Sequence, residues 1–195
     1  MTHGTPASVL ARTAVQQGAV WRRAIAVGQD ERVVENEADL LALLRELDDP
    51  EWLEWPRSYD RRAAADQLAR VTARLEADFA TSCATERDAQ DSSEYGRILV
   101  PAEATRGTAR IVVCVSKFGS LAVICAENPG AYFGTQDAFT EGALDPADLA
   151  KVEKALIKFG CTVVPEELLK CDYDGPSLPY LRGRPIWADR FFGVF

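Results

Sequence analysis

Residues 109–126 read ARIVVCVSKFGSLAVICA, and this stretch decides the fold. Two apolar runs, 109–116 and 120–126, flank the short KFG connection at 117–119, which predicts an antiparallel hairpin. Residues 111–115 are apolar at every position, so both faces of this strand are expected to be buried. The sequence therefore predicts a central strand in a sheet that a helix covers on one side.

Helical patterns lie on both sides of this hairpin. Downstream, Asp145 is a predicted N-cap, Pro146 suits the first helical position, and Gly160 ends the helix. Upstream, apolar residues at helical spacing predict helices over 36–47 and 59–79. Further expected elements are a helix at 5–18, strands at 19–27, 32–35, 81–85, 95–100 and 161–164, a one-turn helix at 165–170, an irregular segment at 51–56 and a long loop at 128–142.

The order of these elements predicts the fold class. Helices come first, then strands, then a helix and a strand, which favours an α+β fold over an alternating βαβ fold. We expect N-terminal helices followed by a mainly antiparallel sheet, packed against the helix in the C-terminal half. A chain of 195 residues fits a single domain over 1–195. The alternative division is an N-terminal helical subdomain over 1–80 and an α+β portion over 81–195.

Composition excludes several classes of partner. The chain is 47% hydrophobic and 27% charged, as in globular proteins, and its net charge of −8 argues against nucleic acid. Residues 27–60 hold eleven acids and three bases, so this stretch alone matches the net charge. The sequence has no apolar run near the roughly 20 residues that span a bilayer, so we expect no membrane partner. Residues 1–18 lack the pattern of a secretory signal, which favours a cytoplasmic location.

Several catalytic scaffolds lack a required residue. His3 is the only histidine and lies near the N-terminus, which disfavours a Ser-His-Asp or Cys-His arrangement and a zinc site. The five cysteines are widely spaced without a C-x-x-C pair, so we expect reduced, buried thiols. The glycine-rich loops that bind nucleotides are also missing. The sequence thus favours a protein that is not an enzyme, with no catalytic residue, cofactor or metal site.

An acidic cluster precedes the strand at 95–100. Glu86, Asp88, Asp91 and Glu94 fall within nine residues and are our first candidates for binding a basic partner. The same residues are compatible with a solvated loop between strands. They are also compatible with a Mg²⁺ or Ca²⁺ site, although the ligand ladder with a central glycine is missing. The acids at 46–54 are a second candidate face.

The C-terminal tail combines large aromatic residues with charge. Trp187, Asp189 and Arg190 lie in WADRFF, a composition typical of binding hot spots, and are further candidates for contact with a partner. In the alternative interpretation the aromatic side chains dock against the sheet and Arg190 pairs with an acid.

A family resemblance covers about residues 75–195. The motifs that carry it, in chain order, are CATERDAQDSSEYGRILV, KFGSLAVI, TVVPEELLKCDYDG and WADRFF. In these motifs the chain resembles small bacterial proteins, some of which are identified as immunity proteins of polymorphic toxin systems. The resemblance implies a cytoplasmic binding protein that neutralises a toxin by plugging its site. It carries over no catalytic residue.

Two functions from different classes follow. The first is a protein-binding module, an immunity-type inhibitor that occludes a basic toxin by steric and electrostatic means. The alternative is a small-molecule enzyme or ligand-binding protein, with a pocket built from the 132–139 loop and the tail and with Arg182, Arg184 or Arg190 binding an anion. A third interpretation is a structural subunit in which Trp52 and Trp55 contact a partner.

Overall fold

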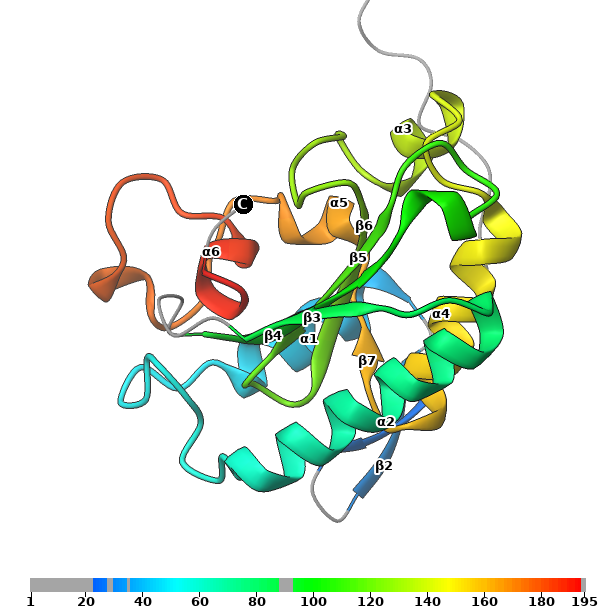
Figure 1. The fold of residues 1–195 in the computed structure, drawn as a ribbon. Coiled ribbons are helices and arrows are strands. Elements are labelled where there is room, and N and C mark those ends of the chain that lie inside the picture. The colour runs from blue at the N-terminus through cyan, green and yellow to red at the C-terminus, as the bar shows by residue number, and fades with distance from the viewer. Residues whose placement is uncertain (1–22, 28–29, 35, 88–92, 194–195) are drawn as a thin grey trace, which may run out of the picture.

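The computed structural model of this chain describes residues 23–27, 30–34, 36–87 and 93–193. It has a two-stranded sheet and a five-stranded sheet with helices around it (Figure 1). The strands are β1 (Arg23–Val27), β2 (Asp30–Val34), β3 (Ala84–Glu86), β4 (Glu94–Val100), β5 (Ile111–Ser116), β6 (Leu121–Ala126) and β7 (Thr162–Val163). The helices are α1 (Glu37–Leu47), α2 (Arg61–Phe79), α3 (Thr135–Thr140), α4 (Pro146–Lys158), α5 (Glu166–Leu169) and α6 (Trp187–Phe191), with short 3-10 turns η1 (Ala102–Ala104) and η2 (Leu178–Tyr180).

The predicted hairpin forms the middle of the larger sheet. β5 and β6 pair antiparallel, from Ile111 opposite Ala126 to Val115 opposite Ala122. The strand order is β3-β4-β5-β6-β7, so β5 is the central strand. β7 pairs in parallel with β6, whereas the other neighbours in this sheet are antiparallel. The prediction of an α+β fold with a mainly antiparallel sheet is confirmed.

Helices cover both faces of this sheet, not one as the sequence predicted. Because side chains alternate along a strand, Ile111, Val113 and Val115 of β5 join the core under α2 and α4. Val112 and Cys114 join the opposite core, with α1, α5 and α6. Figure 1 shows α2 and α4 on one side of the sheet and α5 and α6 on the other. The sequence did not predict the layer on the second face, because this layer consists mainly of short helices and irregular chain.

Polar N-caps set where the long helices begin. The side chain of Asn36 accepts from the N–H of Asp39, and that of Asp145 accepts from Ala147 and Asp148, as the sequence predicted. α2 begins at residue 61, two residues later than predicted, because Asp60 is its N-cap. The cap residue, more than the apolar rhythm, therefore fixes the first turn.

Several predicted segments differ in the structure. The loop predicted at 128–142 contains α3, whose N-cap Gly134 has no side chain that could have signalled a helix. The strand predicted at 81–85 forms at 84–86, and the tail contains the short helix α6. The helix predicted at 5–18 lies outside the described residues.

The helices before residue 80 share cores with the strands after it. Leu44 of α1 is fully buried with Val123 of β6 in the core that also holds α6. Leu75 of α2 is fully buried with Ile98 of β4 in the other core. α1 and α2 therefore bury their apolar faces against the five-stranded sheet, whose strands all lie after residue 80. None of the helices that the structure describes combines the length and apolar character needed to cross a bilayer.

The cysteines are free thiols with unequal exposure. Cys114, Cys125 and Cys161 are buried, as predicted, and Cys83 is half-buried. Burial raises the pKa of the Cys161 thiol to about 12. Cys171 departs from the prediction, because it follows α5 on an exposed part of the chain.

Candidate functional site

A buried ion pair joins the end of α1 to the C-terminal helix. Asp48 is the C-cap of α1, and Arg190 lies on α6. Arg190 Nε lies 2.5 Å from Asp48 Oδ1, with side-chain exposures of 1% and 0%. The partners are 142 residues apart in the chain. A charge pair at this depth has a large desolvation cost, so it is retained only where further hydrogen bonds satisfy both groups.

Tyr173 and Ser177 supply those bonds to the carboxylate. The Tyr173 hydroxyl donates to Asp48 Oδ2, and the Ser177 hydroxyl donates to Oδ1 at 2.5 Å. The Ser177 N–H lies 3.3 Å from Oδ2. Burial, with the hydrogen bond to Asp48, raises the pKa of Tyr173 to about 12. Gly175 is needed in this space, because a Cβ there would lie 2.6 Å from Asp48 Oδ2.

The guanidinium of Arg190 bonds to backbone carbonyls of the loop after α1. Arg190 donates to the carbonyl of Leu53 at 2.9 Å, of Trp52 at 3.3 Å and of Asp49 at 3.4 Å. Its Cζ lies 4.4 Å from the centroid of the Phe118 ring. We call Asp48, Tyr173, Ser177 and Arg190 together the Asp48 hub.

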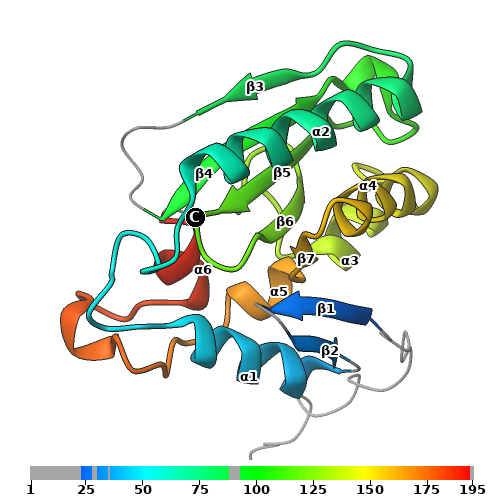
Figure 2. The same ribbon diagram turned by 90° about the horizontal axis from the view of Figure 1, so that it is seen from below.

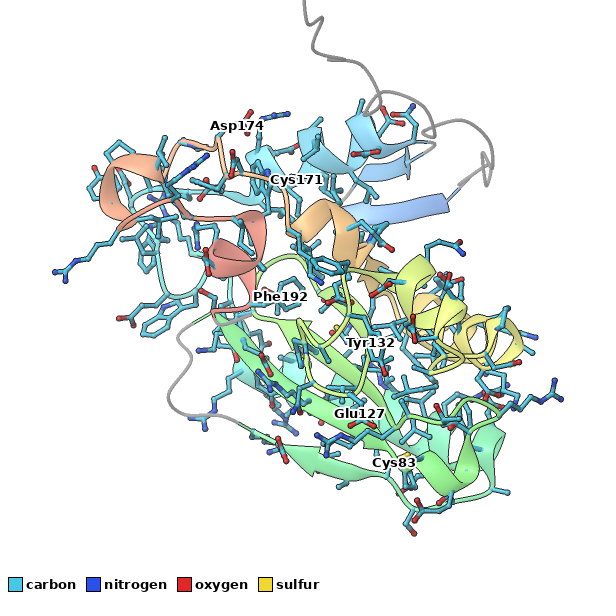
Figure 3. All side chains as sticks on the ribbon, turned by 90° about the horizontal axis from the view of Figure 1, so that it is seen from above. Cys83, Glu127, Tyr132, Cys171, Asp174 and Phe192 are labelled. Atoms are coloured by element: carbon cyan, nitrogen blue, oxygen red, sulfur yellow. The ribbon has the colours of Figure 1, made fainter. Side chains whose placement is uncertain are left out.

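The Asp48 hub fixes two irregular segments at one end of the molecule. One is the loop at 49–56 and the other is the segment at 172–186, which also pairs with α1 through Arg45 and Asp174 at 2.7 Å. Figure 3 shows Asp174 and Cys171 beside α1. Both segments project on the side of the molecule where α6 lies (Figure 2). Loops held through buried polar contacts lose little further conformational freedom when a partner binds.

These two segments expose large apolar side chains. Trp55 is 42% exposed, Leu178 44% and Tyr180 61%. Glu51 and Glu54 are exposed in the same loop as Trp55. We call the exposed side chains of 49–55 and 176–182 the loop surface. It contains Glu51 and Glu54 of the second acidic face that the sequence suggested, whereas Asp48 of that face is buried. Of the two tryptophans considered as interface residues, Trp55 is exposed and Trp52 is half-buried.

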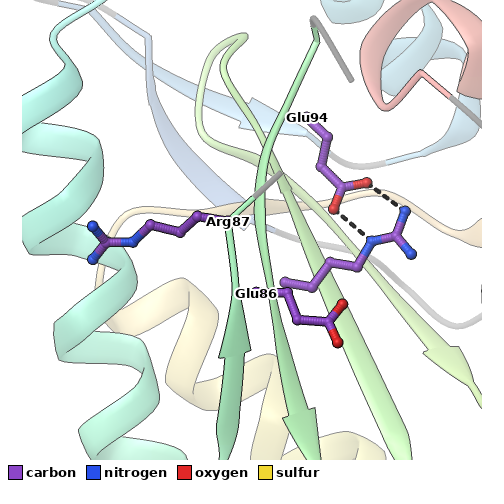
Figure 4. Close-up of a pocket in the computed structure, with 4 residues that line it drawn as sticks. Glu86, Arg87 and Glu94 are labelled. Carbon is purple, nitrogen blue, oxygen red and sulfur yellow. Dashed lines mark hydrogen bonds and ion pairs between the residues drawn. The ribbon is translucent and has the colours of Figure 1, made fainter. Parts of the chain in front are cut away.

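The first predicted acidic face is only partly exposed. Glu86 is exposed on the edge strand β3, but the Glu94 side chain is 1% exposed and binds Arg97 through contacts of 2.6 and 2.9 Å. Both acids line a pocket of about 130 Å³ with Arg87 and Arg97 (Figure 4). The pairing of β3 with β4 brings these side chains together, because Glu86 lies opposite Arg97 in the ladder. Asp88 and Asp91 lie outside the described residues.

The aromatic tail is docked, so its interpretation as an exposed patch is corrected. Trp187 is 1% exposed and its ring centroid lies 4.7 Å from that of Tyr173. Asp189 accepts from the N–H of Ile186 at 2.8 Å, at the start of α6. Arg190 is buried and paired with Asp48. The alternative interpretation, with docked aromatics and a paired arginine, is confirmed, because α6 carries its apolar face into the core.

The 132–139 loop, which the sequence predicted to form a pocket with the tail, is bonded to α5. Lys170 Nζ donates to the carbonyl of Tyr132 and lies 2.9 Å from Glu166, which also accepts from the N–H of Gly130. These contacts tie the loop to α5, and they leave Phe133 88% exposed. A pocket between this loop and the tail stays a prediction.

Within the residues that the structure describes, no three His, Cys, Asp or Glu side chains gather so as to hold a metal ion. No family model, curated protein or solved structure matches the chain.

Sequence reasoning missed Asp48, Tyr173 and Ser177. The sequence predicts Asp48 only as one of the acids of the 46–54 face, and it singles out neither Tyr173 nor Ser177. Their function depends on contacts over more than 120 positions, for which the local sequence has no signal.

Proposed function

We propose that the protein is a protein-binding module, an immunity-type inhibitor that occludes a bacterial toxin, and that it binds through the loop surface. The observation that carries this proposal is the exposure of Trp55, Leu178 and Tyr180 on two segments tied to the buried Asp48 hub. Exposed aromatic side chains on a pre-ordered backbone are typical anchors of protein interfaces.

Charge supports a basic partner. Residues 46–54 contain five acids and no lysine or arginine, and two of these acids are paired, Asp48 with Arg190 and Glu51 with Arg57 at 3.5 Å. Glu54 stands next to Trp55, and the whole chain carries a net charge of −8. A positively charged toxin domain would therefore associate faster with this surface than a neutral protein would. Glu86, Asp88 and Asp91 stay a second predicted contact, whereas Glu94 is buried against Arg97.

The test begins with capture of the partner. The tagged chain is incubated with an extract of its native host in moderate salt, and stoichiometric proteins are identified by mass spectrometry. The purified candidate is then titrated against the wild type and Trp55→Ala, Tyr180→Ala and Glu54→Lys variants, and its toxicity is measured with and without the chain.

Anchor residues of this type cost about 2 kcal/mol or more when truncated, so Trp55→Ala should weaken binding at least about 30-fold. Glu54→Lys should slow association at low salt. Ile157→Ala is the matched control, because Ile157 is 39% exposed but lies on α4. Equal affinity for all variants would remove the loop surface from the proposal. A captured protein that is not toxic, or whose toxicity persists, would overturn the immunity-type function.

A further inference from the structure

A second pocket lies between the start of α2 and the β5–β6 turn. Its volume is about 330 Å³, near the lower end of the range for small-molecule sites. Tyr59, Asp60, Gln67 and Arg70 line it from the α2 side, and Lys117 and Ser120 line it from the turn. It is separate from the Asp48 hub.

The charge around this pocket is opposite to that of the whole chain. Arg70 and Lys117 line it, and Arg61 is close enough to lower the pKa of Tyr59, which burial raises overall. Asp60 is the acid in the lining, and one of its oxygens accepts from the N–H groups of Arg62 and Ala63. A chain with a net charge of −8 thus concentrates cations at one pocket.

The lining also offers uncharged polar groups. Ser120 and Tyr59 contribute hydroxyls and Gln67 a side-chain amide. The Gln67 amide already donates to the carbonyl of Phe159 at 2.8 Å, which holds its side chain in place. Hydroxyl donors beside two cationic side chains suit a group with several acceptor oxygens.

The turn side of the pocket is fixed by the core. Gly119 and Ser120 have φ of 55° and 52°, and a Cβ at Gly119 would lie 2.6 Å from Leu47. The carbonyl of Ser120 accepts from Thr162 at 3.1 Å, and the N–H of Lys117 donates to Ser93 at 2.9 Å. The backbone that carries Lys117 and Ser120 is therefore set before any ligand arrives.

We propose that this pocket binds the oxyanion group, a phosphate or a carboxylate, of a small molecule, with Arg70 and Lys117 supplying the charge. The proposal goes beyond the proposed function and does not rest on it. It does not use the N-terminus of α2 as the anion site, because Asp60 already caps those N–H groups. The ligand differs from the anion expected at the tail, since it contacts none of Arg182, Arg184 or Arg190.

The experiment titrates inorganic phosphate and, separately, succinate into the ¹⁵N-labelled full chain and follows amide shifts. We expect saturable shifts at 117–120 and 58–67 with at least one probe, and the probe that saturates first identifies the preferred oxyanion. Lys117→Glu and Arg70→Glu should each weaken binding at least 10-fold. Arg106→Glu is the control, because Arg106 is exposed and does not line the pocket.

A thermal melt shows whether either charge reversal prevents folding. If it does, Lys117→Met and Arg70→Met replace the charge reversals in the titration. Saturable binding that Tyr180→Ala leaves intact would support the pocket even if no protein partner exists, because Tyr180 does not line it. Shifts that do not saturate with either probe, or affinities that match between the wild type and both charge reversals, would overturn the proposal.

Discussion

The two faces of the five-stranded sheet are covered in different ways. On one face, α2 and α4, with 19 and 13 residues, lay continuous apolar stripes over the strands. On the other, the 11-residue α1 is joined by α5 and α6, which have 4 and 5 residues. Helices as short as α5 and α6 are not stable alone in water. They therefore depend on tertiary contacts for their position.

Buried polar pairs supply those contacts on the second face. Arg190 ties α6 to the end of α1 through Asp48, and Lys170 and Glu166 tie α5 to the loop at 130–132. Polar pairs of this kind add little net stability against an apolar replacement, but they accept only one geometry. Long helices in this protein are thus positioned by burial of their apolar faces, whereas short ones are positioned by specific polar bonds.

The largest expected effect is loss of the Asp48 hub. Arg190→Met leaves a buried carboxylate without its cation and three backbone carbonyls without their donor, so the free energy of unfolding should fall by about 3–5 kcal/mol. Urea denaturation measures this change. Adding Asp48→Asn removes the stranded charge and should recover part of the loss. If Arg190→Met alone were as stable as the wild type, the second face would not need its ion pair.

A truncation in the first face sharpens the contrast. Leu75 is fully buried under α2, and Leu75→Ala should lower the free energy of unfolding by about 2–5 kcal/mol through lost burial and a cavity. Hydrogen exchange should accelerate along α2 and stay unchanged at 49–56. Faster exchange at 49–56 in Leu75→Ala would mean that the two faces are coupled, contrary to the comparison.

A methyl group beside the hub tests its geometry. Gly175→Ala places a carbon 2.6 Å from Asp48 Oδ2 and 2.5 Å from the Tyr173 hydroxyl, so crowding should cost about 1–3 kcal/mol. Thermal melting and exchange at 172–186 measure this effect. Unchanged exchange in that segment would show that the hub tolerates displacement.

High pH should weaken the second face through Tyr173. Its pKa is raised from near 10 to about 12 in the folded chain, so its contribution is complete below pH 10 and is lost as pH rises toward 12. The thiols of Cys83 and Cys161, with raised pKa values, act in the same direction. Tyr173→Phe should flatten the fall between pH 10 and 12, by at most about 1.4 kcal/mol per pH unit. An identical slope in both proteins would contradict this assignment.

The smallest effect concerns thiol access. Cys171 is exposed, although burial and the nearby Glu37 and Asp172 raise its pKa, and it should react with iodoacetamide first. Cys114 and Cys125 lie within the sheet and should react only when the chain unfolds. Mass spectrometry of timed samples gives the order. Early modification of Cys114 would show that the second face opens more readily than its contacts suggest.

The sequence by itself determined the elements that carry their own signals. The hairpin at 109–126, the cap and stop of α4, and the rhythm of α2 were all predicted, because each depends on neighbours within a few positions. The α+β class followed from their order. The sequence also predicted that the tail could dock with Arg190 paired to an acid.

Only the tertiary structure decided which residues meet. It buried Glu94 against Arg97, withdrew Trp187 and Arg190 from the surface, and chose Asp48 as the acid for Arg190. It also assembled the loop surface and the second pocket from segments far apart in the chain. The physical reason is that side-chain hydrogen bonds and charge pairs depend on positions in space, whereas the local pattern of a sequence specifies only periodicity, caps and turns.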